Sequence, residues 1–120
     1  MLINNKETQP MPWLFLILAA ICEMSWPLGF KLTSGFRTNI WITIATVLVM
    51  LLSFYFLSQA TIRGIPIGTA YAVWTGLGAV GTAIIGITLF QESRDLIRLL
   101  CLSLIIVGVV GLKFSTPTPT

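Results

Sequence analysis

Four long apolar runs, separated by three short polar segments, account for almost the whole chain. The runs are 19 to 25 residues long, and a helix needs about 20 predominantly apolar residues to cross a bilayer. The pattern therefore predicts an all-α membrane protein with four transmembrane helices per chain. The predicted spans are residues 12–31, 38–62, 66–90 and 96–114.

The polar segments between the runs predict short turns, the first with Gly35 as its turn residue. They are Lys31–Asn39, Thr61–Pro66 and Gln91–Asp95. Loops this short make neighbouring helices antiparallel, so we expect an up-down-up-down bundle over residues 12–114. Polar tails are expected at residues 1–11 and 115–120. Four helices enclose little volume, so a chain that moves a solute would work at least as a dimer.

The composition excludes several classes of protein. The chain is 56% hydrophobic and 9% charged, against about 25% charged residues in a typical soluble domain. It has no histidine, and Cys22 and Cys101 lie in apolar runs, where cysteine acts as a small hydrophobe. We therefore expect no metal or other cofactor and no enzyme active site. The net charge of +3 is scattered over tails, loops and helix ends, which does not indicate nucleic-acid binding.

The basic residues are divided almost equally between the two sides of the membrane. Three lie on the side of the termini and four on the other side. They are Lys6, Arg63 and Lys113 on the first side, and Lys31, Arg37, Arg94 and Arg98 on the second. Because Lys/Arg asymmetry sets orientation, this near-balance predicts insertion both ways and an antiparallel, dual-topology homodimer. The alternative is a single orientation chosen by other features of the chain.

Glu23 is an acid in the middle of the first apolar run. A charge near the membrane centre costs about 2.5–3.5 kcal/mol on insertion scales, and such residues are usually functional. Desolvation favours the neutral form, so this carboxyl can hold either a proton or a cation. The alternative is a protonated glutamic acid that joins two helices by a hydrogen bond.

The neighbours of Glu23 at helical spacing suit a binding site. Ala19 and Ala20 leave room beside the acid, and Trp26 offers an aromatic wall for a cation. Pro27 has no N–H for the carbonyl of Glu23, so the helix should kink beside the acid and free that carbonyl. Alternatively, the tryptophan packs against lipid or a helix, and the proline is merely tolerated.

The second and third runs add polar and aromatic candidates. Tyr71 supplies a hydroxyl able to bond a carboxylate, and Trp74 a second aromatic wall on the same helical stripe. Ser53 lies deep in the second run and could bond Glu23. Its alternative partner is the backbone of its own helix.

Glycines in the third and fourth runs indicate close helix contacts. Gly76, Gly78 and Gly81 let another helix approach and weaken their own helix, and a helix that bends at its centre suits alternating access. Packing alone is the alternative. Gly108 and Gly111 lie in the fourth run, which has no interior acid, so we assign that helix to dimerisation.

Several whole stretches of the chain resemble the small multidrug resistance transporters. The resemblance covers about Pro12 to Phe114 and is closest to the guanidinium-exporter subtype. It rests on Glu23, Trp26, Lys31, "SFYFLSQA" (Ser53–Ala60), "PIGTAYAVWTGLGA" from Pro66 and, within it, "GTAYAVWTG" (Gly68–Gly76). The subtype typically has a small residue where this chain has Pro27, and the longer polar N-terminus also departs from it.

The resemblance implies a homodimer that exchanges protons for guanidinium-type cations. It also implies that proton and substrate compete for the paired Glu23 carboxyls, with Trp26, Ser53, Tyr71 and Trp74 around them. The leading hypothesis is thus a proton-coupled exporter of guanidinium and small guanidinyl cations in the bacterial cytoplasmic membrane. The alternative within the family is a broad exporter of quaternary ammonium compounds. A different class is a non-transporting membrane subunit or a lipid-flippase component.

Overall fold

The computed structural model describes residues 12–116 of the chain, and these form five helical segments. The helices are α1 (Pro12–Glu23), α2 (Ser25–Leu32), α3 (Ile40–Ile62), α4 (Ile67–Leu89) and α5 (Leu96–Ser115). Because α1 and α2 follow each other as one span, four helical stretches among these residues are long and apolar enough to cross a membrane. The predicted all-α membrane fold is confirmed.

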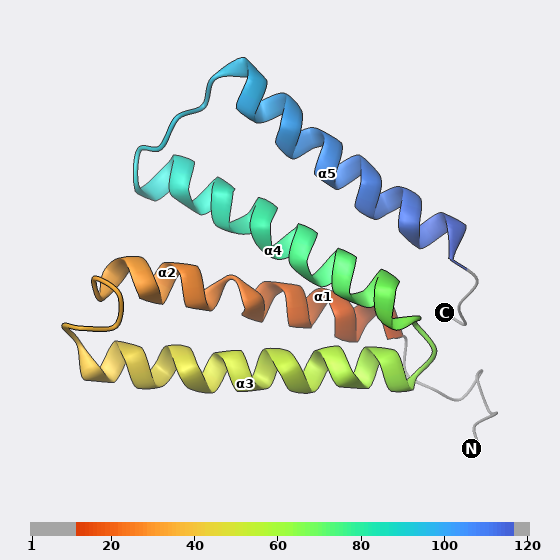
Figure 1. Ribbon diagram of the computed structural model, residues 1–120, viewed down its shortest axis with the longest axis horizontal. Helices are drawn as coiled ribbons and strands as arrows, with labels where there is room; N and C mark the ends of the chain where they lie inside the picture. Colours follow the sequence, from red (N-terminus) through yellow and green to blue (C-terminus); the bar gives the residue numbers. More distant parts are fainter. Residues whose placement is uncertain (1–11, 117–120) are drawn as a thin grey trace.

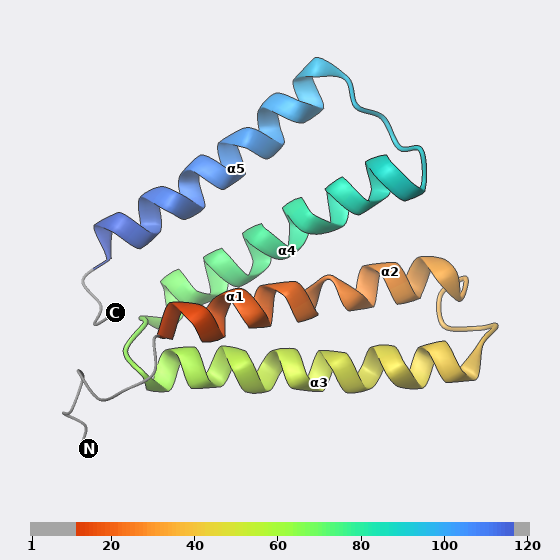
Figure 2. The ribbon, with the colours of Figure 1, turned by 180° about the vertical axis from the view of Figure 1, so that it is seen from behind.

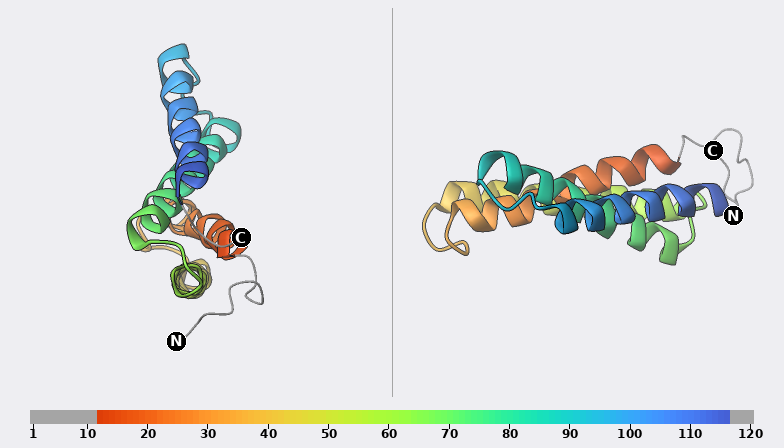
Figure 3. Two further views of the ribbon diagram at one scale, coloured as in Figure 1. Left: turned by 90° about the vertical axis from the view of Figure 1, so that its right-hand side faces the viewer. Right: turned by 90° about the horizontal axis from the view of Figure 1, so that it is seen from above.

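The four spans alternate in direction, but they do not close into a bundle (Figure 1). Helices α1, α3 and α4 pack on one another, whereas α5 packs chiefly on α4 (Figure 2). The described chain is a slab of 47 × 37 × 18 Å. Figure 3 shows it from one end and from above, and it is narrow in both views. The expected up-down-up-down order is thus present, but the single chain does not close it into a compact bundle. No residue of α5 is buried, and beyond α4 this helix reaches α1 through Lys113, whose Nζ lies 5.1 Å from the centroid of the Trp13 ring.

The core lies where α1, α3 and α4 meet, near the end of the slab that holds the α3–α4 turn. Its buried members are Trp13, Leu16, Ala19, Ala60, Ile65, Ala70, Val73 and Trp74. Alanines at the contact allow the helix backbones to approach closely, as is common in membrane helix packing. Toward the other end of the slab, α4 diverges from α2 (Figure 1). The space between these two helices is where the cavities described below are found.

Side-chain caps set where two of the helices begin. The Asn39 side chain accepts hydrogen bonds from the N–H groups of Trp41 (3.0 Å) and Ile42 (3.2 Å), so α3 starts after it. The Asp95 carboxylate accepts from the N–H of Arg98 at 2.9 Å and caps α5. Each cap satisfies backbone donors that a helix start leaves unpaired.

The first span is interrupted at Met24, beside the intramembrane acid. The N–H of Met24 donates to the carbonyl of Ile21 at 3.3 Å, which is a tighter turn than the α-helix makes. Pro27 cannot donate to the carbonyl of Glu23, which removes one α-helical bond from this turn. Where a kink was predicted beside the acid, the helix is interrupted. Participation of the freed carbonyl in the site stays a prediction.

The first turn and the end of the last helix lie near their expected positions. Gly35 occupies the turn after α2 with φ +81°, a left-handed conformation that favours glycine. Helix α5 runs to Ser115, which had been assigned to the C-terminal tail. The predicted N-terminal tail, residues 1–11, and residues 117–120 lie outside the described residues.

Candidate functional site

A cavity of about 400 Å³ opens between the first span and α4 and extends to the start of α5. The first span contributes Glu23 and Trp26 to its wall, and α4 contributes Gly78 and Thr82. Arg98, in the first turn of α5, lines the far end. The lone acid of the first apolar run therefore faces a space of a size that small-molecule sites use.

The Glu23 side chain packs directly on α4 at Gly78. A Cβ atom added at Gly78 would lie 2.7 Å from Glu23 Cγ, so only glycine leaves room for this side chain. Glu23 Oε2 accepts a hydrogen bond from the Trp26 indole Nε1 at 3.2 Å. Glu23 Oε1 is buried and has no hydrogen-bond partner among residues 12–116. One oxygen is thus oriented by the indole, and the other is buried without a partner in the part of the chain that the structure describes.

Ser53 does not bond Glu23, and it does not bond its own helix either. Its hydroxyl donates to the carbonyl of Ala19 at 2.8 Å and accepts from the Trp74 indole Nε1 at 2.9 Å. Ser53 and Trp74 are both buried in the core. The reason is that the buried Trp74 indole N–H requires an acceptor, and the Ser53 hydroxyl supplies it. The bond from Ser53 to Ala19 lies one turn before the acid. Ser53 therefore joins α1, α3 and α4 beneath the site.

Replacing Ser53 by alanine should destabilise the protein by about 1–2 kcal/mol, because the Trp74 N–H then stays buried without an acceptor. The measurement is the unfolding midpoint of the purified protein in detergent, followed by tryptophan fluorescence. Ser58→Ala is the matched control, since Ser58 is exposed and bonds a carbonyl of its own helix, that of Tyr55. Equal midpoints for the two variants would contradict the linking role of Ser53.

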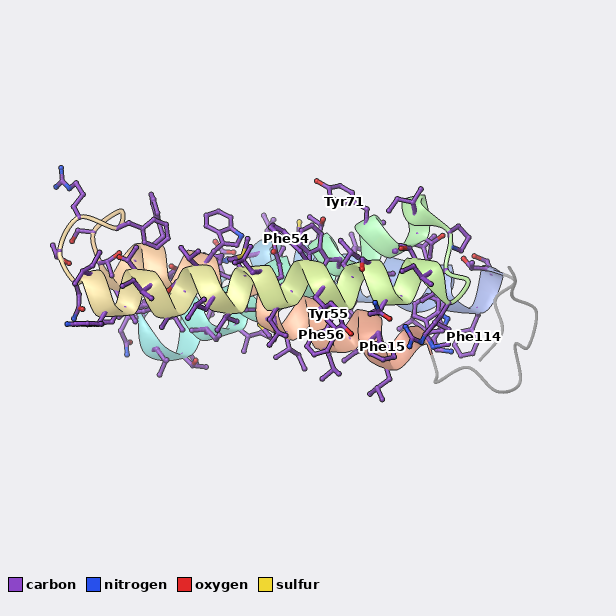
Figure 4. All side chains as sticks on the ribbon, turned by 90° about the horizontal axis from the view of Figure 1, so that it is seen from below. Phe15, Phe54, Tyr55, Phe56, Tyr71 and Phe114 are labelled. Atoms are coloured by element: carbon purple, nitrogen blue, oxygen red, sulfur yellow. The ribbon has the colours of Figure 1, made fainter. Side chains whose placement is uncertain are left out.

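Tyr71 and Trp74 do not reach the cavity within one chain. Tyr71 is exposed on α4, and its ring centroid lies 5.7 Å from that of Trp74. Figure 4 shows Tyr71 and Phe54 on one side of α3 and Phe56 on the other. The expected bond from the Tyr71 hydroxyl to Glu23 is absent among the described residues of this chain. Its place in the site stays a prediction that needs a second copy.

The three glycines of α4 that the sequence singled out lie at close helix approaches. Gly78 faces Glu23, and a Cβ added at Gly81 would collide with the Met24 side chain at the break in the first span. Gly76 faces α5, where an added Cβ would lie 3.2 Å from Val109. The glycines therefore set how closely α4 approaches its neighbours on both sides.

Gly108 and Gly111 lie on an open face of α5. A Cβ atom added at either would meet nothing within 4 Å in this chain. Their assignment to a dimer contact stays a prediction.

An ion pair at the far end of the cavity was not identified as part of the site from the sequence. Arg98 Nη2 lies 2.9 Å from Glu92 Oε1, and both residues line the same cavity as Glu23. From the sequence, Arg98 was used only to assess orientation, and Glu92 was only a member of the third turn. The signal that could have found them is the position of Glu92 directly after an uncharged run. Among residues 12–116, no group of three or more acidic, histidine or cysteine side chains could hold a metal.

Comparison with known proteins agrees with this geometry. The family model described as Small Multidrug Resistance protein matches residues 11–105. The chain belongs to the small multidrug resistance family. Relatives from Citrobacter freundii (50% identical) and Escherichia coli strain K12 (46%) each align over 88% of this chain and 99% of their own length. A relative from Proteus vulgaris is 47% identical over 88% of this chain and 100% of its own length. All three are named guanidinium exporter.

As a member of this family, the protein is a multi-pass membrane transporter rather than an enzyme. The family match spans all of the first three membrane crossings and the first half of α5. It therefore includes every residue that lines the cavity around Glu23.

Proposed function

We propose that this chain exports guanidinium and small guanidinyl cations in exchange for protons across the bacterial cytoplasmic membrane. The observation that carries the proposal is the Glu23 carboxyl, which lies at mid-span in a cavity with one oxygen unpartnered. Relatives that align over almost their whole length and are named guanidinium exporter support guanidinium as the cation.

The site suits a flat cation with several N–H donors. A guanidinium group pairs with a carboxylate through two parallel hydrogen bonds, which adds geometric specificity to the charge. Glu23 offers its free Oε1 and, beside it, the Oε2 that Trp26 orients. The indole of Trp26 also presents an aromatic face that attracts cations.

Competition for one carboxyl provides the coupling. A protonated Glu23 has no charge to hold the cation, and a cation held by the carboxylate leaves no place for the proton. A site that holds one or the other, but never both, converts an inward proton gradient into outward cation transport. This step needs no residue other than Glu23 to change its charge.

We infer that the working unit is an antiparallel homodimer. A slab 18 Å thick, with its cavity against one side of α4, does not enclose a path for a solute. The near-equal numbers of basic residues on the two sides support opposite insertion of two copies. The open face of α5 with Gly108 and Gly111, and the exposed Tyr71, are the surfaces that a second copy would contact.

The proposal is tested with purified wild-type protein in liposomes under an imposed pH gradient. Guanidinium should drive proton exchange at least about tenfold faster than a bulky tetraalkylammonium ion at equal concentration. A pH-sensitive dye trapped in the liposomes reports the exchange. The family description favours a second candidate, a multidrug exporter, and the opposite ranking would support it. No exchange with either cation would support a non-transporting subunit.

A further inference from the structure

The cavity of Glu23 contains a second carboxylate, that of Glu92, on the turn between α4 and α5. An adjoining cavity of about 160 Å³ is lined by Glu92 as well, together with Lys31 and Phe90. Glu92 therefore stands where the two spaces meet. The proposed function assigns it no role.

The backbone of the turn holds the Glu92 carboxyl against α4. Gln91 adopts a left-handed conformation with φ +58°, which reverses the chain after the helix. The N–H of Glu92 then donates to the carbonyl of Gly86 at 3.1 Å. A Cβ atom at Gly86 would collide with the Glu92 carboxyl, so glycine makes room for it.

Glu23 and Glu92 therefore both pack against one stripe of α4, each at a glycine. Glu23 lies on Gly78 and Glu92 lies on Gly86, eight residues later. Eight residues of helix rise by about 12 Å. Thr82 lies midway, lines both cavities, and its buried Oγ1 has no hydrogen-bond partner among residues 12–116. The stripe thus carries a carboxylate, a hydroxyl and a second carboxylate in sequence.

The group that Glu92 holds in this structure is itself a guanidinium. Arg98 Nη2 approaches Glu92 Oε1 at 2.9 Å, and the two side chains are 34% and 40% exposed. Ion pairs that are this exposed are weak, because water screens the charges. A free guanidinium ion has the same planar donors as the arginine side chain, so it can replace Arg98 on the carboxylate.

We propose that Glu92 is an outer binding site for guanidinium at the mouth of the cavity, and that Arg98 occupies it until the substrate displaces the side chain. The proposal rests on the proposed export of guanidinium. The substrate then passes Thr82 to reach Glu23. Glu92 governs how quickly the cation is captured, whereas Glu23 governs how tightly it is held.

The test compares Glu92→Gln with Arg98→Gln in the liposome assay. Glu92→Gln should lower kcat/KM for guanidinium about tenfold, while the equilibrium Kd, measured by tryptophan fluorescence, changes less than twofold. Arg98→Gln frees the carboxylate and should raise kcat/KM about threefold. It leaves the cap of α5 in place, because that bond uses the backbone N–H of Arg98.

Two control variants each remove one charge from the same turn and leave the side chains of the pair intact. They are Asp95→Asn and Arg94→Gln. Asparagine also caps helices well, and the Arg94 side chain is exposed. Both should stay within twofold of wild type.

The outer site predicts that Glu92→Gln and Arg98→Gln change kcat/KM in opposite directions. If the ion pair only fastens the α4–α5 turn, then breaking it from either side has the same effect, and both variants lower kcat/KM together. That result, or a pair of variants no different from their controls, overturns the outer site. Wild-type protein that moves no guanidinium would instead overturn the proposed function. Arg98→Gln alone suffices if Glu92→Gln does not fold, because a lowered rate in it contradicts the displacement.

Discussion

Glu23→Gln is expected to abolish exchange of guanidinium for protons while the protein remains folded. Glutamine has nearly the same shape as glutamic acid, and its amide oxygen can still accept the bond from Trp26 Nε1. What the substitution removes is the ability to carry a charge or release a proton. Both halves of the transport cycle require that ability, so we expect the rate to fall at least about 100-fold, equivalent to about 2.7 kcal/mol.

The measurement is guanidinium-driven proton release from the purified variant, with liposome exchange beside it. Glu23→Asp is the matched control, because it keeps the carboxylate but withdraws it from α4 by one methylene. It should retain measurable exchange at a reduced rate. If Glu23→Gln exchanged as the wild type does, the proton would have to be carried by another group, and the competition proposed for this carboxyl would be wrong.

The number of membrane spans and the position of the acid could be predicted, because both follow from how each side chain interacts with the lipid bilayer. A run of about 20 apolar residues suits a bilayer wherever it occurs, and a carboxylate inside such a run is costly enough to stand out. The break beside Glu23 was also predictable, since it follows from the missing N–H of Pro27. These features need no knowledge of which helices meet.

The partners of the polar side chains could not be predicted in the same way. In a bilayer the lipid is as apolar as the protein core, so the hydrophobic pattern does not tell which face of a helix meets another. From the sequence, Ser53 could bond either Glu23 or its own helix, whereas it bonds Ala19 and Trp74. The position of α5, chiefly beside α4, and the pairing of Glu92 with Arg98 depend on the same missing information.

Gly78→Ala is expected to weaken guanidinium binding about tenfold, although it adds only one methyl group. The new Cβ would lie 2.7 Å from Glu23 Cγ, so the acid must move off α4 and its carboxyl turns away from the position that Trp26 fixes. A tenfold loss of affinity corresponds to about 1.4 kcal/mol. Overpacking costs about 1–3 kcal/mol, and the gain of about 1 kcal/mol in helix propensity offsets part of it, so the folded protein should survive.

Gly68→Ala is the matched control on the same helix. A Cβ atom at Gly68 meets nothing within 4 Å, so this variant changes helix propensity without moving a neighbour. Titration of both variants with guanidinium, followed by tryptophan fluorescence, should separate them. Gly78→Ala keeps the charge that Glu23→Gln removes. A loss of guanidinium affinity in Gly78→Ala but not in Gly68→Ala therefore shows that the position of the carboxyl matters. Unchanged binding in Gly78→Ala would mean that contact with α4 does not position the acid.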